Sequence, residues 1–319
     1  MTTTIRDVAR KAHVSVATVS RALSSPGLVR PDTRSRVLAA ASELGYQPNR
    51  AARGLITGKT GNIGIVVPDL DNPFYTGILK AARSRAAQSD HAVFVADSDE
   101  DPGSEIKLVQ AMAKQVDGLL LCSPGLTDAQ LSTLADTPVV LLDHRLPGIP
   151  STVMDSADGV RQVIAHLTAL GHTRIAYLDG PHTSWSAGQR RQGLGVDLIE
   201  LGPFPPRYEG GLQAADLALA ADVTAIMAYN DVMALGVLTR LRDRGVSVPG
   251  DVSVTGFDNL TYASLTSPAL TTVRMPLASA GRTAVAMLLD WLDTTDTPAP
   301  HVVLPTQLIV RGTTAPPRS

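Results

Sequence analysis

The sequence predicts a small all-α helix-turn-helix head followed by an α/β body of two doubly wound parallel-sheet subdomains. Three observations support this division. The charge changes sign near residue 60, roughly the first 45 residues contain three helical stretches joined by short turns, and from residue 62 short apolar runs alternate with amphipathic stretches. A chain of 319 residues with 44% hydrophobic residues is long enough for two or three domains. We expect a head at residues 1–47, a short hinge at 48–60 and a body at 61–319.

The charge asymmetry indicates a polyanion as the partner of the head. Up to residue 60 there are ten basic and three acidic residues, a net charge of +7. The rest of the chain has 18 basic and 27 acidic residues, a net charge of −9. A basic head on an acidic body is typical of proteins that bind a polyanion through the head. A merely solvated basic helix bundle is the alternative that charge alone leaves open.

Three helices are predicted in the head. Thr4, with an acid three residues later at Asp7, suits the start of the first helix. Ser15 can cap a second helix whose Val19 and Leu23 face inward. A third helix is expected from about residue 31 to residue 44, with proline at its start and glycine after its end. Two short helices joined by a tight turn, with a third helix beneath them, form the helix-turn-helix plan.

Residues 51–60, "AARGLITGKT", contain a leucine in a segment that is too weak to fold alone. Gly54 and Gly58 oppose helix formation, and so short a helix is expected to be largely unfolded in isolation. Leu55 therefore has no evident core to join. A flexible linker with a chance leucine is one reading of this segment.

The head resembles the DNA-binding head of the LacI/GalR family of bacterial transcription regulators. The resemblance rests on "TIRDVARKAHVSVATVSRAL" followed by "VRPDTRSRVLAAASELGYQPNRAARGL", and His13 is a departure that a left-handed turn position tolerates. It implies that the second helix enters the major groove and that the segment after "PNR" becomes a helix on specific DNA. Leu55 would then be a wedge at the central base step. The expected DNA-binding residues are Ser15, Val16, Ala17, Thr18, Ser20, Arg21, Asn49, Arg50, Ala52 and Leu55.

The residue types of the second helix suit this role. Arg21 can donate two hydrogen bonds to guanine O6 and N7, whereas Val16 and Ala17 can only touch a thymine methyl group or exclude a wrong base edge. Ser15, Thr18 and Ser20 are better placed for phosphates. We therefore expect Arg21 to be the principal base reader.

Seven apolar runs predict the strands of the body: "IGIVVPDL", "HAVFVADS", "GLLLCSP", "PVVLLDH", "RIAYLDG", "TAIMAYND" and "VSVTGFDN". Continuous apolar strands separated by amphipathic stretches of helical length indicate parallel sheets covered on both faces. Asp, Asn, Ser or Gly closely follows the apolar part of each run. Ligands bind beyond the carboxyl ends of such strands, so these residues predict a site, although any one of them can be polar merely because it enters a turn.

Residues 62–315 resemble the periplasmic sugar-binding-protein fold attached to LacI/GalR heads, through "PDLDNPFY", "LGHTRIAYLDG", "YNDVMALG", "VPGDVSVTGFDN" and "TTVRMPLASAGRTAV". The resemblance implies two subdomains hinged around a small effector. Carboxylates and amides suit vicinal hydroxyls, an arginine offers a planar fork, and aromatic faces suit a ring; Trp185 is expected in a loop. The expected effector-binding residues are Asn72, Phe74, Asp143, His144, Trp185, Arg190, Tyr208, Asn230 and Asp258.

Three departures leave the effector's identity open. His144 stands where many relatives have arginine, Met275 replaces a common glutamine, and the connection around residues 194–215 is short. The effector is expected to be a sugar or a nucleoside, with a deoxy or modified sugar or an aromatic ligand also open.

The sequence disfavours enzymes, metal sites and membrane proteins. It has no nucleophile elbow, phosphate loop or metal-spaced histidine pair, and its single cysteine, Cys122, lies in an apolar run. No cofactor is expected. No apolar run reaches the length of a membrane span and the N-terminus does not resemble a signal peptide, so we expect a cytoplasmic protein.

The resemblance therefore implies a homodimer that reads a near-palindromic double-stranded DNA operator, with recognition helices about one helical turn apart. The tail lacks a heptad pattern for a tetramer. A small effector would switch operator affinity, either by releasing DNA or by tightening binding. A solute-binding receptor without a transcriptional role is the alternative function.

Overall fold

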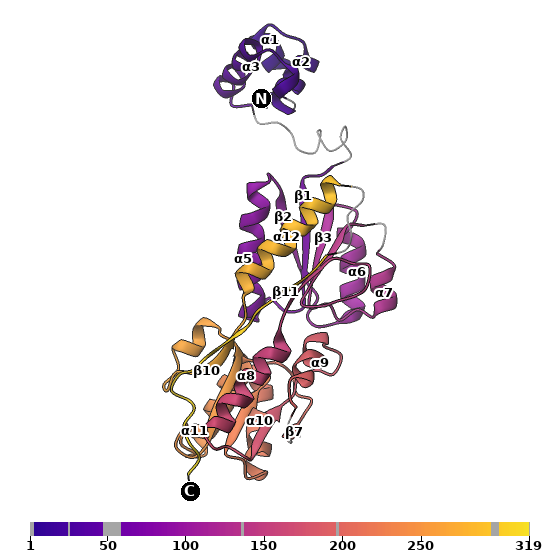
Figure 1. The fold of residues 1–319 in the computed structure, drawn as a ribbon. Coiled ribbons are helices and arrows are strands. Elements are labelled where there is room, and N and C mark those ends of the chain that lie inside the picture. The colour runs from indigo at the N-terminus through magenta and orange to yellow at the C-terminus, as the bar shows by residue number, and fades with distance from the viewer. Residues whose placement is uncertain are drawn as a thin grey trace. The chain divides into compact units, whose positions relative to one another are not determined.

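The computed structural model describes residues 3–24, 26–46, 59–134, 137–195, 198–294 and 300–318. The chain divides into one compact unit over residues 1–61 and a second over residues 62–319. The first unit contains α1 (Ile5–Ala12), α2 (Val16–Ser24), the short 3₁₀ helix η1 (Pro26–Leu28) and α3 (Pro31–Glu43), as Figure 1 shows. The hinge predicted at residues 48–60 lies almost wholly outside the described residues.

Local hydrogen bonds set the ends of the helices in the first unit. The Thr4 backbone N–H donates to Asp7 Oδ2 at 3.0 Å, and the Thr18 N–H donates to Ser15 Oγ at 3.1 Å. His13 ends α1 in the left-handed conformation, with φ of 53°. Three valines, Val8, Val19 and Val37, are fully buried between the helices. The head is a helix-turn-helix unit, as the sequence predicts.

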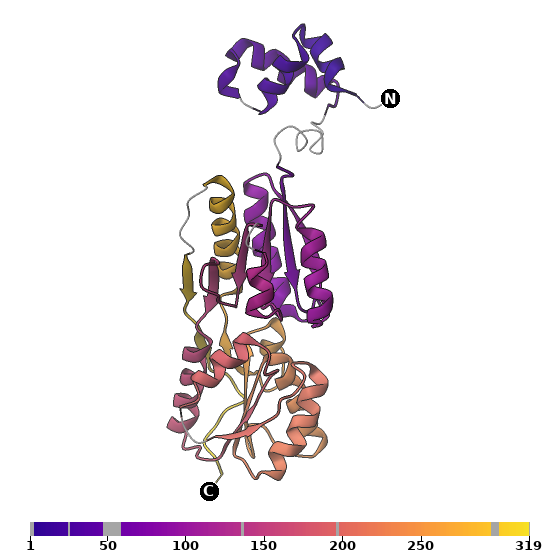
Figure 2. The same ribbon diagram turned by 90° about the vertical axis from the view of Figure 1, so that its right-hand side faces the viewer.

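The body contains two sheets of six strands each, as assigned among the described residues, and Figures 1 and 2 show them as two subdomains. The first sheet has the order β11-β5-β4-β3-β1-β2, with all pairs parallel. Its strands are β1 (Asn62–Val67), β2 (Ala92–Asp97), β3 (Gly118–Cys122), β4 (Val139–Leu142), β5 (Ser151–Met154) and β11 (His301–Leu304). The helices of this subdomain are α5 (Pro73–Gln88), α6 (Pro102–Met112), α7 (Asp128–Ser132) and α12 (Leu277–Asp293).

The second sheet has the order β12-β10-β9-β8-β6-β7, and only β12 runs antiparallel to its neighbour. Its strands are β6 (Ile175–Leu178), β7 (Ile199–Leu201), β8 (Ala225–Ala228), β9 (Ser253–Asp258), β10 (Thr271–Arg274) and β12 (Gln307–Ile309). The helices of this subdomain are α8 (Ser156–Ala169), α9 (Trp185–Gln192), α10 (Tyr208–Ala220), α11 (Asp231–Asp243) and the 3₁₀ helix η2 (Thr261–Ser264).

The chain passes between the subdomains where β5 leads into α8, where β10 leads into α12, and where β11 leads into β12. As a result α12, which comes late in the chain, packs beside α5 on the first sheet, and both views show this pair. Crossing segments of this kind let two rigid halves move about a common hinge.

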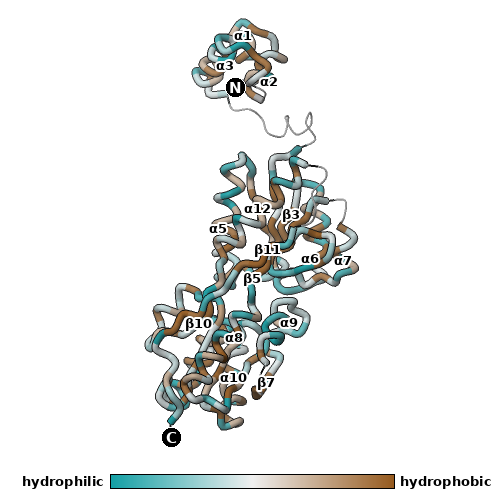
Figure 3. Tube along the Cα trace, in the orientation of Figure 1, coloured by the Kyte–Doolittle hydropathy of each residue, from teal (hydrophilic) through white to brown (hydrophobic). Residues whose placement is uncertain are grey.

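The apolar runs form the interior of the body. β3 and β4 are buried along their whole lengths, which a parallel sheet covered on both faces requires. Figure 3 shows hydrophobic residues concentrated along strands such as β3, with hydrophilic residues in the connections. All seven predicted runs are strands, and the predicted architecture of two parallel-sheet subdomains is confirmed.

Candidate ligand cavity and nucleic-acid interface

The α2 helix presents a polar and partly apolar face to solvent, opposite its buried face. Val16 is 41% exposed, and Ala17 and Arg21 are also exposed. The Arg21 Nε donates to the Ala17 carbonyl at 3.2 Å, so the guanidinium follows the helix surface. The predicted residues Asn49, Arg50, Ala52 and Leu55 lie outside the described residues.

The start of α2 carries hydroxyl groups that suit phosphate oxygens. Ser15 Oγ and Thr18 Oγ1 lie 2.8 Å apart, and both are close to the N-terminal backbone N–H groups of the helix. Helix N-termini attract anions through these N–H groups and the helix dipole. Ser20 is half-buried and lies one turn farther along the helix. This face can therefore combine phosphate contacts with base contacts.

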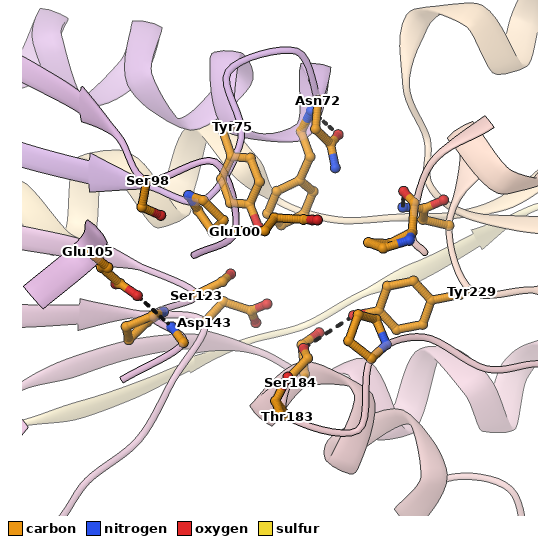
Figure 4. A pocket seen from close by; sticks show the side chains of 18 of the residues that line it. Asn72, Tyr75, Ser98, Glu100, Glu105, Ser123, Asp143, Thr183, Ser184 and Tyr229 are labelled. Atoms are coloured by element: carbon orange, nitrogen blue, oxygen red, sulfur yellow. Dashed lines mark hydrogen bonds between the residues drawn. The ribbon is translucent and has the colours of Figure 1, made fainter. Parts of the chain in front are cut away.

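A cavity of about 230 Å³ is lined by residues that follow strands of both sheets, and Figure 4 shows it closely. Six of the nine predicted effector-binding residues line it: Asn72, Phe74, Asp143, Arg190, Asn230 and Asp258. The cavity thus lies between the subdomains and draws on both. The strand-end rule located it because parallel strands within each sheet end at one edge.

Two of the predicted ligand residues cap helices. Asn72 Oδ1 accepts a hydrogen bond from the Phe74 N–H at 3.0 Å at the start of α5. Asn230 Oδ1 accepts from the Met233 N–H at 2.8 Å, and its Nδ2 donates to the Pro206 carbonyl at 2.9 Å. These bonds fix the cavity walls, and they leave Asn230 with one amide hydrogen and one oxygen lone pair for a ligand.

Arg190 forms the centre of the second subdomain's wall. Its guanidinium lies 4.2 Å from the centroid of the Tyr229 ring and 4.1 Å from that of Phe257. It donates to the Tyr229 carbonyl, and one of its terminal nitrogens lies 3.5 Å from Asp258 Oδ1. Aromatic rings at these distances hold a buried cation by cation–π attraction. These contacts therefore fix the position and orientation of the Arg190 guanidinium.

Three polar atoms of the cavity wall have no hydrogen-bond partner within the described part of the chain: Asp143 Oδ1, Arg190 Nε and Asp258 Oδ1. Their side chains are almost fully buried, and buried polar groups without partners are costly. Asp143 and Asp258 also have positive φ values of 54° and 116°. Strain of this kind is retained at functional sites. A bound polar ligand would satisfy these atoms.

Burial governs the ionisation of both aspartates. It raises the pKa of Asp143, and the positive charge of Arg190 is the main influence that lowers it. It raises the pKa of Asp258 far more than Arg190 lowers it, and the nearby Asp231 adds to the rise. A ligand that donates hydrogen bonds would favour the ionised forms.

The remaining three predicted ligand residues do not line this cavity. The His144 and Trp185 rings contact each other, with centroids 5.9 Å apart, and burial lowers the pKa of His144. Trp185 was expected in a loop, and this is wrong: it begins α9, because Ser184 Oγ accepts from the Ala187 N–H and caps the helix. Tyr208 begins α10 and is 36% exposed.

Sequence reasoning missed several lining residues. Glu105 lies on α6, and its Oε2 accepts a hydrogen bond from the Gly125 N–H at 2.9 Å. A glutamate in the first turn of a helix is common and marks no ligand site, so its place in the cavity follows only from the tertiary fold. The other polar or aromatic lining residues that were missed are Tyr75, Ser98, Glu100, Ser123, Thr183, Ser184, Ser186 and Tyr229.

An arginine joins the two subdomains beside the cavity. Arg207 precedes α10 in the second subdomain, and its nitrogens lie 3.4 Å from Asp99 Oδ1, 3.4 Å from Glu100 Oε2 and 3.7 Å from Asp69 Oδ2. The three carboxylates belong to loops of the first subdomain. These ion pairs form only when the subdomains are close together.

The described residues contain no group of three or more His, Cys, Asp or Glu side chains that could hold a metal ion. Separately, none of the helices that could be assessed is both long enough and apolar enough to cross a membrane.

Known protein families match both the head and the body of the chain. Residues 4–49 match the family described as "Bacterial regulatory proteins, lacI family", and residues 164–314 match "Periplasmic binding protein-like domain". The regulator GalS of Salmonella typhimurium is 37% identical, covering 95% of this chain and 94% of its own. The repressor CytR of Escherichia coli is 32% identical, covering 98% and 96%.

Solved structures of regulators also match this chain over nearly its whole length. The lac repressor dimer bound to operator and the anti-inducer ONPF has a TM-score of 0.88 and 31% identity, covering 99% of this chain and 100% of its own. The complex of the regulator CelR with cellobiose has a TM-score of 0.73 and 30% identity, covering 98% and 99%. The resemblance inferred from the residues is confirmed, and the chain belongs to the LacI family of bacterial regulatory proteins.

Proposed function

We propose that the protein is a cytoplasmic, ligand-responsive repressor that binds a near-palindromic DNA operator as a homodimer. The observation that carries the proposal is the presence, in one chain, of an exposed recognition-helix face and a cavity between two hinged subdomains. The exposed Arg21 offers base recognition, and the hydroxyls of Ser15 and Thr18 offer phosphate contacts. The head distinguishes this function from that of a solute-binding receptor without a transcriptional role.

We propose a sugar or a nucleoside as the ligand. Asp143, Arg190 and Asp258 supply acceptors and donors for hydroxyls, and Phe74 and Tyr229 supply flat apolar faces. The similar structure of CelR holds cellobiose, which supports a sugar-like ligand.

Ligand binding would be coupled to DNA binding through the hinge between the subdomains. A ligand that contacts both walls favours one separation of the subdomains, and the ion pairs of Arg207 stabilise the closed form. That motion would control whether the Leu55 segments of a dimer meet on DNA. Because such coupling is reciprocal, the operator must change ligand affinity by the same factor.

Selection of bound duplexes from a random pool tests the DNA-binding part. The full-length protein should enrich a near-palindrome whose half-sites are about one helical turn apart. Arg21→Ala should relax the preference at one base position in each half-site. Arg36→Ala, which removes an exposed charge from α3 of the same head, should leave the profile unchanged. A pool without any enriched sequence would overturn the proposal.

A further inference from the structure

Glu105 is a buried carboxylate in the cavity wall that has no cation beside it. Glu105 is only 4% exposed to solvent. Its Oε2 accepts the Gly125 N–H, and among the described residues no lysine, arginine or histidine nitrogen pairs with it. The other carboxylates of the wall differ: Glu100 pairs with Arg207, and Asp258 lies beside Arg190. A buried carboxylate that lacks a cation is costly unless a ligand supplies one.

The lining as a whole is acidic. It contains four carboxylates, those of Glu100, Glu105, Asp143 and Asp258, and within the described lining Arg190 is the one basic side chain. Arg190 is already committed to Asp258 and to the Tyr229 carbonyl. An anionic group such as a phosphate would therefore meet carboxyl groups and no uncommitted cation, whereas a cationic amine would meet hydrogen-bond acceptors whose ionised form it favours.

A second observation indicates that this part of the wall awaits a ligand. Asp143 is only 2% exposed, lines the same cavity, and its Oδ1 has no hydrogen-bond partner among the described residues. Figure 4 shows Glu105, Ser123 and Asp143 on one side of the cavity, with Ser184 and Tyr229 opposite them. A ligand that spans this space would meet acceptors on the first subdomain and aromatic and hydroxyl groups on the second.

We propose that the effector carries a cationic amino group that binds Glu105, and that the cavity selects amine-bearing sugars or nucleosides over phosphorylated ones. The ammonium would donate to Glu105 Oε1, while Oε2 keeps its bond to Gly125. The inference rests on the proposed function, because it takes the cavity to be the effector site. It adds the chemical class of the effector and names a specificity-determining residue.

The test compares matched ligands on the full-length protein. Binding of hexosamines and 6-amino-6-deoxyhexoses is measured by calorimetry beside their neutral parent sugars and the parent 6-phosphates. Wild-type protein should bind at least one amine about tenfold or more tighter than its parent, as a charge-assisted hydrogen bond allows, and the phosphate more weakly than the parent. A parent sugar that binds as tightly as every amine, or a phosphate that binds more tightly, would overturn the inference.

Glu105→Gln separates charge from shape. The amide oxygen can still accept the Gly125 N–H, so the wall is retained while the charge is removed. The variant should bind the parent sugar about as the wild type does and lose the preference for the amine. An unchanged amine preference would overturn the assignment of Glu105. Glu200→Gln, at an exposed site on β7, is the matched control.

The two proposals fail in different ways. If a neutral sugar binds and no amine binds better, the amine inference fails and the proposed sugar-responsive function stands. If no sugar of any kind binds, the sugar class fails and the amine-bearing sugar fails with it.

Discussion

Replacing Glu105 with glutamine should make the protein more stable at neutral and alkaline pH. Burial raises the pKa of Glu105 from 4.5 to about 7, against the opposing effect of the Gly125 hydrogen bond. Between these two values the folded protein holds a proton that the unfolded chain has released. The free energy of unfolding therefore falls as the pH rises through this window, by about 1.4 kcal/mol per unit of pKa difference and at most about 3.5 kcal/mol in total.

Glutamine resembles the protonated acid and does not titrate. Wild type and Glu105→Gln should therefore melt at similar temperatures near pH 4.5 and diverge as the pH rises. At pH 8 the variant should melt roughly 4 °C or more above the wild type, given the usual relation between free energy and melting temperature for a body of this size. Other titrating groups are common to both proteins, so the difference between the two curves isolates Glu105.

The assay is thermal unfolding followed by circular dichroism at several pH values from 4.5 to 8, with Glu200→Gln as the exposed control. A variant that is less stable than the wild type at pH 8 would refute the reasoning. So would a difference in melting temperature that does not change with pH, because that difference would come from packing rather than from ionisation.

Three further predictions concern closure, response and DNA. Arg207→Gln should weaken ligand binding by up to about fivefold, because partly exposed ion pairs contribute about 1 kcal/mol or less, and the loss of affinity should shrink at high salt. Arg282→Gln on α12 is the control. Equal ligand affinities of Arg207→Gln and the wild type in calorimetry would exclude a role of Arg207 in closure. Asp258→Asn should abolish the ligand-induced rise in melting temperature while operator affinity is kept; a retained rise would move the ligand elsewhere. Leu55→Ala should weaken specific operator binding far more than nonspecific binding in fluorescence anisotropy, and equal losses would contradict the wedge.

Much of the fold could be predicted because its signals are local. A fully buried parallel strand has to be a continuous apolar run, as in β3 and β4, so those strands are visible in the sequence. Short strands at or near the sheet edges, such as β7 and β12, have only three residues each and bury few of them. Their pairing is decided by neighbouring strands, and no local pattern marks it.

The site was predictable where residues follow strands or belong to a family motif, as Phe74 and Arg190 do on their helices, and not where a residue carries neither signal. Asp143 and Asp258 were found because strand ends converge at one edge of each sheet. Glu105 was missed because the packing of α6 brings it beside Gly125, twenty residues later in the chain. The polar residues around Trp185 are typical of a loop, but the Ser184 hydroxyl caps α9 and Trp185 begins that helix.

The coupling between the cavity and the DNA-binding face is tested most directly by one titration. The duplex enriched from the random pool is titrated with the full-length protein by fluorescence anisotropy, with and without a saturating amount of the ligand that most raises the melting temperature. The account predicts that the ligand changes the operator Kd by about fivefold or more, in either direction, and that the operator changes the ligand Kd by the same factor. Identical operator affinities with and without bound ligand would contradict it.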